Sequence, residues 1–176
     1  CDSTADNKPT SGGETFAIDS TVPAPFSPQS IKVTVTSASI EGDTMSTGTG
    51  LAAVAGTVAV GSVYFKGTNG SSYRIHLDWK NTDASSTAGT VTTFTATGQW
   101  QLLSPVSTTV AAGKTGDQIR IVVVTDTARA ESFWVANAMI QVGLPREFYI
   151  ATSGGVTKTR PASLGDGHFY APTLGR

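Results

Sequence analysis

The chain has 176 residues, a formal net charge of −1, and only 14% charged residues. This length suits one domain with a substantial core. The sequence lacks the clustered Lys and Arg that nucleic-acid binding requires, and no apolar run approaches the ~20 residues that span a bilayer. We therefore expect no nucleic-acid partner and no membrane span.

Short runs of Val, Ile and Thr alternate with 19 glycines and 8 prolines. β-branched residues favour pleated strands, whereas Gly and Pro favour the turns between them. No segment shows the 3.6-residue period of an amphipathic helix. The pattern predicts an all-β, antiparallel β-sandwich (jelly roll) over residues 30–150, with an extended arm over 1–29 and a tail or linker over 151–176.

The single cysteine is Cys1, so no intramolecular disulfide is available. Two interpretations of its position stay open. It is either a lipid-bearing cysteine left after signal cleavage, or simply the first residue of a fragment or of a chain that lost its initiator Met.

The N-terminal arm is polar and proline-rich around Phe26. Closely spaced prolines exclude a central strand, so we expect an extended segment with an edge strand near residues 16–18. The aromatic residues of this arm and of the C-terminal tail are spaced like anchors for a neighbouring subunit or another protein. These assembly residues are Phe16, Phe26, Phe169 and Tyr170.

The first strand of the predicted sandwich, residues 30–36, alternates cleanly, with Ile31, Val33 and Val35 facing inward. Residues 38–56 are expected to be a loop with a short strand at 51–54, and residues 57–66 the next strand. A hairpin turn is expected at residues 67–70, where Asn69-Gly70 tolerates positive φ.

The strand at residues 72–79 places apolar and polar side chains on opposite faces. Tyr73, Ile75, Leu77 and Trp79 share one face, and Arg74, His76, Asp78 and Lys80 share the other. A polar loop follows at 81–89. The remaining predicted strands are residues 91–97, 100–106, 118–125 and 133–142, with a candidate edge strand at 148–150.

Four segments occur in an order that resembles a known family. They are residues 30–34 (SIKVT), 62–67 (SVYFKG), 93–100 (TFTATGQW) and 133–143 (FWVANAMIQVG). The set is similar to the carbohydrate-binding-module-like jelly roll found in phage tail and virion structural proteins. The resemblance implies a non-catalytic sandwich that binds or docks.

Relatives of this type commonly carry Asp where this chain has Ala136, and that Asp helps to hold a structural calcium ion. Relatives also often carry Glu where Gln141 stands. Calcium binds through several oxygen ligands, so the loss of one leads us to expect no cofactor and no tight calcium dependence.

Aromatic side chains are the usual platforms for sugars. Trp79 is expected to pack in the core, since it shares a face with Ile75 and Leu77. The resemblance implies that Trp100 also packs in the core, because relatives carry a core residue at that position. Trp134 and Tyr64 are then the best exposed candidates for carbohydrate or partner contact. Arg74, His76 and Asp78 either hydrogen-bond sugar hydroxyls from a concave sheet or form a solvated face with weak ion pairs.

No catalytic constellation stands out in the sequence. The two histidines, His76 and His168, lack a third metal ligand, and no Gly-x-Ser-x-Gly elbow is present. We therefore expect that the protein is not an enzyme and that it has no metal site.

Two functional hypotheses remain. The first is a virion or extracellular component, a tail, fibre or capsid decoration that self-associates, binds other virion proteins and adheres to host glycans. The second is a secreted or lipid-tethered carbohydrate-binding module of a glycan-degrading system.

Overall fold

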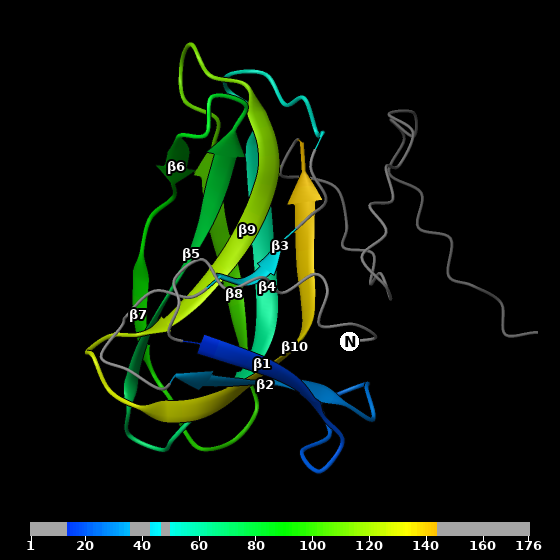
Figure 1. The fold of residues 1–176 in the computed structure, drawn as a ribbon, viewed down its shortest axis with the longest axis vertical. Coiled ribbons are helices and arrows are strands. Elements are labelled where there is room, and N and C mark those ends of the chain that lie inside the picture. The colour runs from blue at the N-terminus through cyan, green and yellow to red at the C-terminus, as the bar shows by residue number, and fades with distance from the viewer. Residues whose placement is uncertain (1–13, 36–42, 47–49, 144–176) are drawn as a thin grey trace, which may run out of the picture.

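The computed structural model of this chain describes residues 14–35, 43–46 and 50–143. Within them the fold consists of ten β-strands in two antiparallel sheets, with no helix (Figure 1). The first sheet has the order β1 (Glu14–Asp19), β2 (Ser30–Val35), β10 (Glu131–Val142), β4 (Val58–Lys66), β8 (Gln101–Thr109). The second has the order β3 (Asp43–Ser46), β9 (Gly116–Thr125), β5 (Ser72–Asn81), β6 (Ser86–Ala88), and β7 (Thr92–Thr95) also pairs with β5. The predicted all-β sandwich is confirmed.

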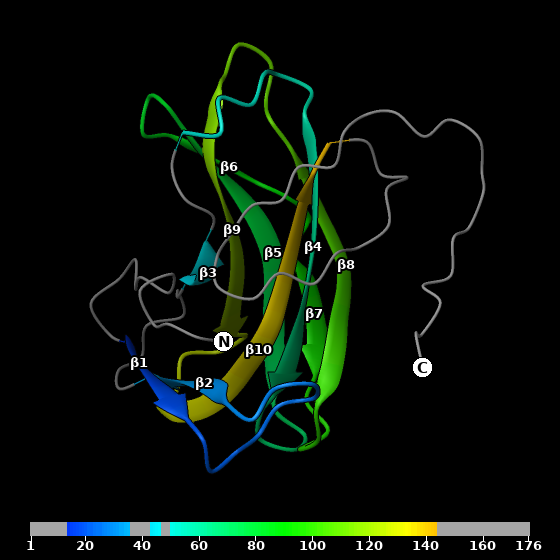
Figure 2. The ribbon, with the colours of Figure 1, turned by 90° about the vertical axis from the view of Figure 1, so that its right-hand side faces the viewer.

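The two sheets pack face to face, as the edge view shows (Figure 2). β5 is the clearest case of sequence dictating packing, because Tyr73, Ile75, Leu77 and Trp79 are all 0–2% exposed. They meet the inward residues of the first sheet, including Phe65 and Phe133. Rings cross edge to face there, with 4.7 Å between the centroids of Phe65 and Tyr73. This aromatic centre contributes the offset and edge contacts that rings prefer.

The turn predicted at residues 67–70 exists, with Gly70 at φ +79°. It is not a hairpin, however, because β4 and β5 belong to different sheets. Gly67 lies where the chain crosses between them, and a Cβ there would fall 2.6 Å from both the Phe65 ring and the Tyr73 hydroxyl. Local turn residues predict a reversal of direction, but they carry no information on which sheet the returning strand joins.

Two short strands were missed where the sequence predicts loops. β6 lies inside the predicted loop 81–89, and β3 lies inside the predicted loop 38–56. The strand predicted at 51–54 is reduced to an isolated bridge between Ala53 and Gly116. Both missed strands are only three or four residues long, too short for a clear alternation in their sequences. β6 pairs with β5 and β3 pairs with β9, so the longer neighbouring strand holds each of them in the sheet.

The N-terminal boundary also requires correction. β1 pairs with β2 along its whole length, and Phe16 packs against the core. The sandwich therefore begins upstream of residue 30, because the edge strand expected near 16–18 is an integral part of the first sheet. The predicted tail and the candidate strand at 148–150 lie outside the described residues.

β10 carries a bulge that reverses its alternation. Phe133 and Val135 are buried, but the register shifts between Ala136 and Met139, and Asn137 adopts φ +47°. Beyond the bulge Ile140 packs against the core. A bulge inserts one unpaired residue and redirects the side chains that follow it, so Met139 faces outward with its cross-strand partner Ser62.

Candidate functional site

The residues predicted to contact a partner divide between opposite faces of the sandwich. Trp134 and Tyr64 alternate with the buried Phe133, Val63 and Phe65, so both lie on the outer face of the first sheet. Arg74, His76 and Asp78 alternate with the buried residues of β5 and lie on the outer face of the second sheet. The structure thus does not bring the five residues together as one site.

The outer face of the second sheet is dominated by internal ion pairing. Asp78 and Arg120 are cross-strand partners, form a salt bridge, and are only 4% and 8% exposed. Arg74 pairs with Asp126 at 3.4 Å, and Ser72 donates a hydrogen bond to the same carboxylate at 3.2 Å. The expectation of a solvated face is wrong for Asp78, which is buried with its counter-ion.

The second face also lacks aromatic platforms. Val122 and Val124 project outward from β9 between the ion pairs, and both are buried. Among the described outward residues of β5, β6, β7 and β9 there is no Trp, Tyr or Phe. His76 lies at the centre of this face, opposite Val122.

The outer face of the first sheet is partly covered by the loop that joins β1 to β2. This loop reaches across β10 toward β8 (Figure 2). The Asn137 side-chain amide donates to the Pro25 carbonyl, and the Trp100 indole donates to the Pro23 carbonyl at 3.0 Å. Ser30 donates to the Val22 carbonyl at 2.7 Å. Three side chains, two of them from distant parts of the sequence, therefore fix a loop that the sequence analysis assigned to an extended arm.

Phe26 lies at the tip of this loop in an unusual backbone conformation. The Ser27 amide donates to the Ala24 carbonyl at 3.2 Å, which closes a turn with Pro25 and Phe26 at its centre. Pro followed by a residue of positive φ is the signature of a type II turn, whose second position ordinarily takes Gly or Asn. Phe26 occupies it at φ +62°, and its side chain is 93% exposed. A bulky residue there is a strained outlier.

Phe26 belongs to a larger group of apolar side chains on the same face. Its ring meets that of Tyr64 edge to face, with 6.2 Å between centroids. Leu102 is the cross-strand partner of Tyr64 and is 48% exposed. We call the following residues the aromatic surface: Phe26, Tyr64, Trp100, Leu102 and Trp134.

Trp134 is fixed at the edge of the aromatic surface. Its indole nitrogen donates to the Asp19 carboxylate at 2.8 Å. Hydrogen bonds from the Thr21 hydroxyl and from the Trp134 indole lower the pKa of Asp19 from 3.8 to about 2. The Lys32 ammonium lies 6.0 Å from the centroid of the Trp134 ring, within the range of a cation–π contact.

Trp100 differs from its prediction. It is half-buried and packs with the β1–β2 loop, whereas sequence analysis placed it in the core. It lies immediately before β8, and outside a strand the alternation of apolar and polar residues does not predict whether a side chain is buried. Trp79, by contrast, is fully buried as predicted.

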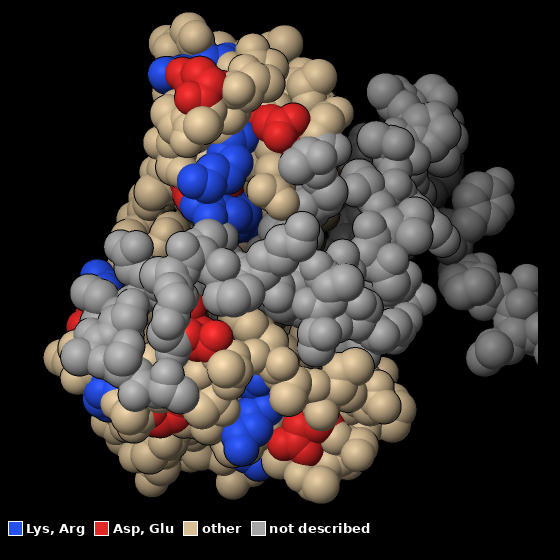
Figure 3. All heavy atoms as spheres, viewed as in Figure 1, with Lys and Arg blue, Asp and Glu red and all other residues tan. Residues whose placement is uncertain are grey.

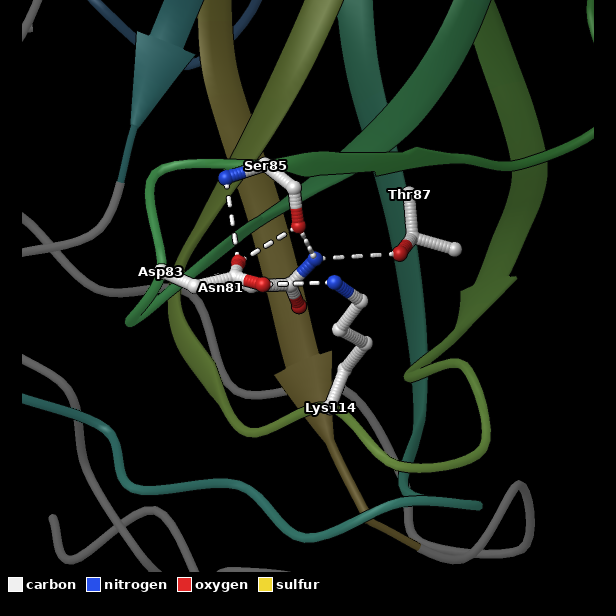
Figure 4. Close-up of polar contacts among 5 residues, drawn as sticks. All are labelled: Asn81, Asp83, Ser85, Thr87 and Lys114. Carbon is white, nitrogen blue, oxygen red and sulfur yellow. Dashed lines mark hydrogen bonds and ion pairs between the residues drawn. The ribbon is translucent and has the colours of Figure 1, made fainter.

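A separate polar cluster joins two loops at one end of the sandwich (Figure 4). The Lys114 ammonium pairs with Asp83 at 2.5 Å, and Asp83 also accepts from the Ser85 hydroxyl at 2.5 Å. The hydrogen bond from Lys114, and to a smaller extent those from Ser85, hold the pKa of Asp83 well below its usual range. The buried Asn81 amide donates to Ser85 and Thr87. The cluster ties the β5–β6 loop to the β8–β9 loop and is a structural clamp.

Charge on the surface is distributed in small groups. The face shown in Figure 3 carries blue and red side chains of both signs in small scattered groups and no extended basic patch. The described residues on this face provide no continuous positive stripe of the kind that tracks a phosphate backbone.

The described residues also bear on metal sites and membrane spans. They contain no group of three or more His, Cys, Asp or Glu placed to hold a metal ion. They also contain no helix that is long and apolar enough to cross a membrane. Calcium independence stays a prediction, and Phe169 and Tyr170 lie outside the described residues.

Comparison with known proteins shows the fold alone. No protein-family model and no curated protein matches the sequence. Among solved structures, the tailspike protein 4 enzymatically active domain of bacteriophage CBA120 matches with a TM-score of 0.58 at 9% identity, over 80% of this chain and 20% of that chain. The arabinose-bound α-L-arabinofuranosidase MgGH51 matches with a TM-score of 0.56 at 12% identity, over 79% and 23%.

A third match names the module type directly. The CBM22-1 and GH10 modules of Clostridium thermocellum xylanase 10B, complexed with xylohexaose, match with a TM-score of 0.50 at 11% identity, over 72% of this chain and 24% of that chain. The resemblance to a carbohydrate-binding-module-like β-sandwich is confirmed at the level of the fold. This chain spans about a quarter or less of the length of each of these three structures.

Proposed function

We propose that this domain is a non-catalytic saccharide-binding module, and that it serves as a structural or adhesive component of a phage tail, fibre or capsid decoration. The observation that supports saccharide binding most strongly is the exposed Phe26 ring, held at positive φ beside Tyr64. Apolar sugar faces pack on such rings, and Lys66, two residues from Tyr64 on the same face of β4, offers a hydrogen-bond donor for hydroxyls.

The strain at Phe26 supports a role in binding. Gly at this position relieves the backbone cost of about 1–2 kcal/mol that a left-handed conformation imposes on an L-residue. Because the ring is almost fully exposed, it contributes little hydrophobic stabilisation to the fold. Residues kept in such conformations cluster at functional sites, so the proposal assigns the ring to a ligand.

The state of the carboxylates supports the non-catalytic part of the proposal. Asp19, Asp78, Asp83 and Asp126 each have a hydrogen-bond or ion-pair partner within the domain. Glycoside hydrolysis needs two carboxyl groups facing each other across the scissile bond. These four carboxylates act as counter-ions and hydrogen-bond acceptors for neighbouring side chains.

The viral assignment and the alternative are tested by assembly. The proposed virion component assembles into symmetric oligomers with virion partners, whereas a secreted or lipid-tethered carbohydrate-binding module of a glycan-degrading system works as a monomer. Solved structures of both kinds share the fold, a phage tailspike and two glycan-degrading enzymes. Native mass spectrometry of the purified chain separates the two, and a monomer at all concentrations contradicts the virion role.

The saccharide assignment is tested with Phe26→Gly on a panel of immobilised polysaccharides. We expect the variant to keep or slightly raise its melting temperature while losing at least tenfold in affinity. Val54→Ala, which removes another exposed apolar side chain, is the matched control and should bind like the parent. Equal binding by the Phe26→Gly variant and the parent, or no binding by the parent to any polysaccharide, contradicts the proposal.

A further inference from the structure

Two lysines flank Trp134 on the outer face of the first sheet. Lys32 of β2 and Lys66 of β4 are its cross-strand partners on either side. Directly opposite residues share a face, and neighbouring strands lie about 4.8 Å apart. Both ammonium groups therefore project from the same side as the indole, one on each flank.

These two cations differ from most others in the described residues. Arg74, Lys114, Arg120 and Arg129 each form an ion pair with an acid. Lys32 and Lys66 form no ion pair with a described residue. The same holds for Lys80, which lies on the second sheet. The charges beside Trp134 are thus available to a ligand.

The acid described on this face forms no ion pair with either lysine. Asp19 is the only acid among the outward residues of the first sheet's described strands, and its carboxylate accepts hydrogen bonds from Trp134 and from Thr21. Its role is to orient the indole. The row Lys32–Trp134–Lys66 therefore combines a ring with positive charge on both sides.

This row continues into the rest of the aromatic surface. Tyr64 lies two residues from Lys66 on the same strand face and diagonally across from Trp134. Diagonal neighbours in a sheet remain within reach of aromatic and long side chains. A chain of sugars packed on Tyr64 and Trp134 passes directly beside both lysines.

From this arrangement we infer that the aromatic surface selects an anionic saccharide, one whose sugar rings carry carboxylate or sulfate groups. The inference rests on the proposed saccharide-binding function and adds the class of ligand. The ring stacks on aromatic side chains, and its acidic substituent, which projects from the ring edge, meets Lys32 or Lys66.

The test compares matched acidic and neutral polysaccharides by affinity electrophoresis and calorimetry. The probes are polygalacturonate against its methyl ester, and dextran sulfate against dextran. We expect at least one acidic member to bind about tenfold more tightly than its neutral partner, and this preference to shrink as salt screens the charges. Equal binding within both pairs overturns the inference.

Lysine variants locate the effect. Lys32→Gln and Lys66→Gln should each weaken binding of the acidic member by roughly threefold to fivefold, the scale of an exposed ion pair. Lys80→Gln, a lysine on the opposite face that also lacks an ion pair, should leave it unchanged. An unchanged affinity in the Lys32→Gln, Lys66→Gln double variant overturns the inference.

The outcomes separate the two levels of the argument. If neutral and acidic polysaccharides bind equally and Phe26→Gly abolishes both, the proposed function stands and the charge selection is wrong. If the parent protein binds no polysaccharide, both are wrong.

Discussion

The two outer faces of this sandwich use their polar residues in opposite ways. On the second sheet, arginine and aspartate neutralise each other across β5 and β9, and the pair at its centre is buried. On the first sheet, two lysines that pair with no acid in the described part of the chain lie beside aromatic rings, and a strained turn exposes Phe26. A sheet whose charges satisfy one another contributes to the fold, whereas a sheet that leaves rings and charges available offers them to a ligand.

The largest effect expected from this contrast is the loss of the buried ion pair. Asp78→Ala removes an acidic partner of the buried Arg120 and should lower the free energy of unfolding by about 3–5 kcal/mol. Arg74→Ala, which breaks a half-exposed pair on the same face, should cost under about 1 kcal/mol. Urea unfolding measures both. Similar small losses for the two variants would show that the second face is not held by its buried pair.

Adjacent aromatic residues on β10 offer the next test. Phe133 is 1% exposed and packs in the core, so Phe133→Ala should cost about 3–5 kcal/mol. Trp134 is half-buried on the aromatic surface, and Trp134→Ala should cost about 1–2 kcal/mol while reducing saccharide affinity. Thermal unfolding unaffected by both substitutions would disprove the assignment of the strand.

Asp19 gives a smaller, pH-dependent effect. Its folded pKa of about 2 lies below the ordinary value of 3.8, so the group stabilises the fold above pH 3.8 and loses that contribution as pH falls toward 2. Asp19→Asn should therefore be less stable than the parent near neutral pH, and the two should converge toward pH 2. Melting temperatures across this range measure it, and a constant difference down to pH 2 would contradict the assignment.

The smallest expected effect is that of calcium. Ala136 is fully buried and offers no side-chain oxygen, so we expect chelator-treated protein to keep its melting temperature when calcium is added. An ion that binds only the native state must raise stability by mass action. A clear rise would reveal a site built from other oxygen atoms.

Sequence reasoning succeeded where alternation alone decides the outcome. The inward residues of β2 and β5 follow from period two, because a one-residue slip exposes every apolar side chain at once. It failed where long-range contacts decide. The bulge at Asn137 interrupts the alternation of β10, and the loop around Phe26 was interpreted as part of an extended arm because its supports, Trp100 and Asn137, lie far along the chain.

The site was predicted only in part for the same reason. Trp134 and Tyr64 were identified from their alternation with buried neighbours, and both belong to the aromatic surface. Arg74, His76 and Asp78 belong to the other sheet, and no local pattern reveals that the turn after β4 crosses between sheets. The positive φ of Phe26 has a trace in the sequence, since Pro25 precedes it in a turn, but a Gly is the usual signal there.

The supports of the β1–β2 loop also set the order in which the molecule is completed. The hydrogen-bond partner of Asp19 is Trp134, 115 residues later in the sequence, and that of Pro25 is Asn137, 112 residues later. Such distant pairings form slowly, because the chain between them must first be closed into a loop. During synthesis the segment that carries Phe26 emerges early, but it is fully anchored only after Trp100 and then β10 have been made. A ligand that requires the complete aromatic surface should therefore bind only fully folded protein. Its binding would distinguish folded chains from chains that are still folding.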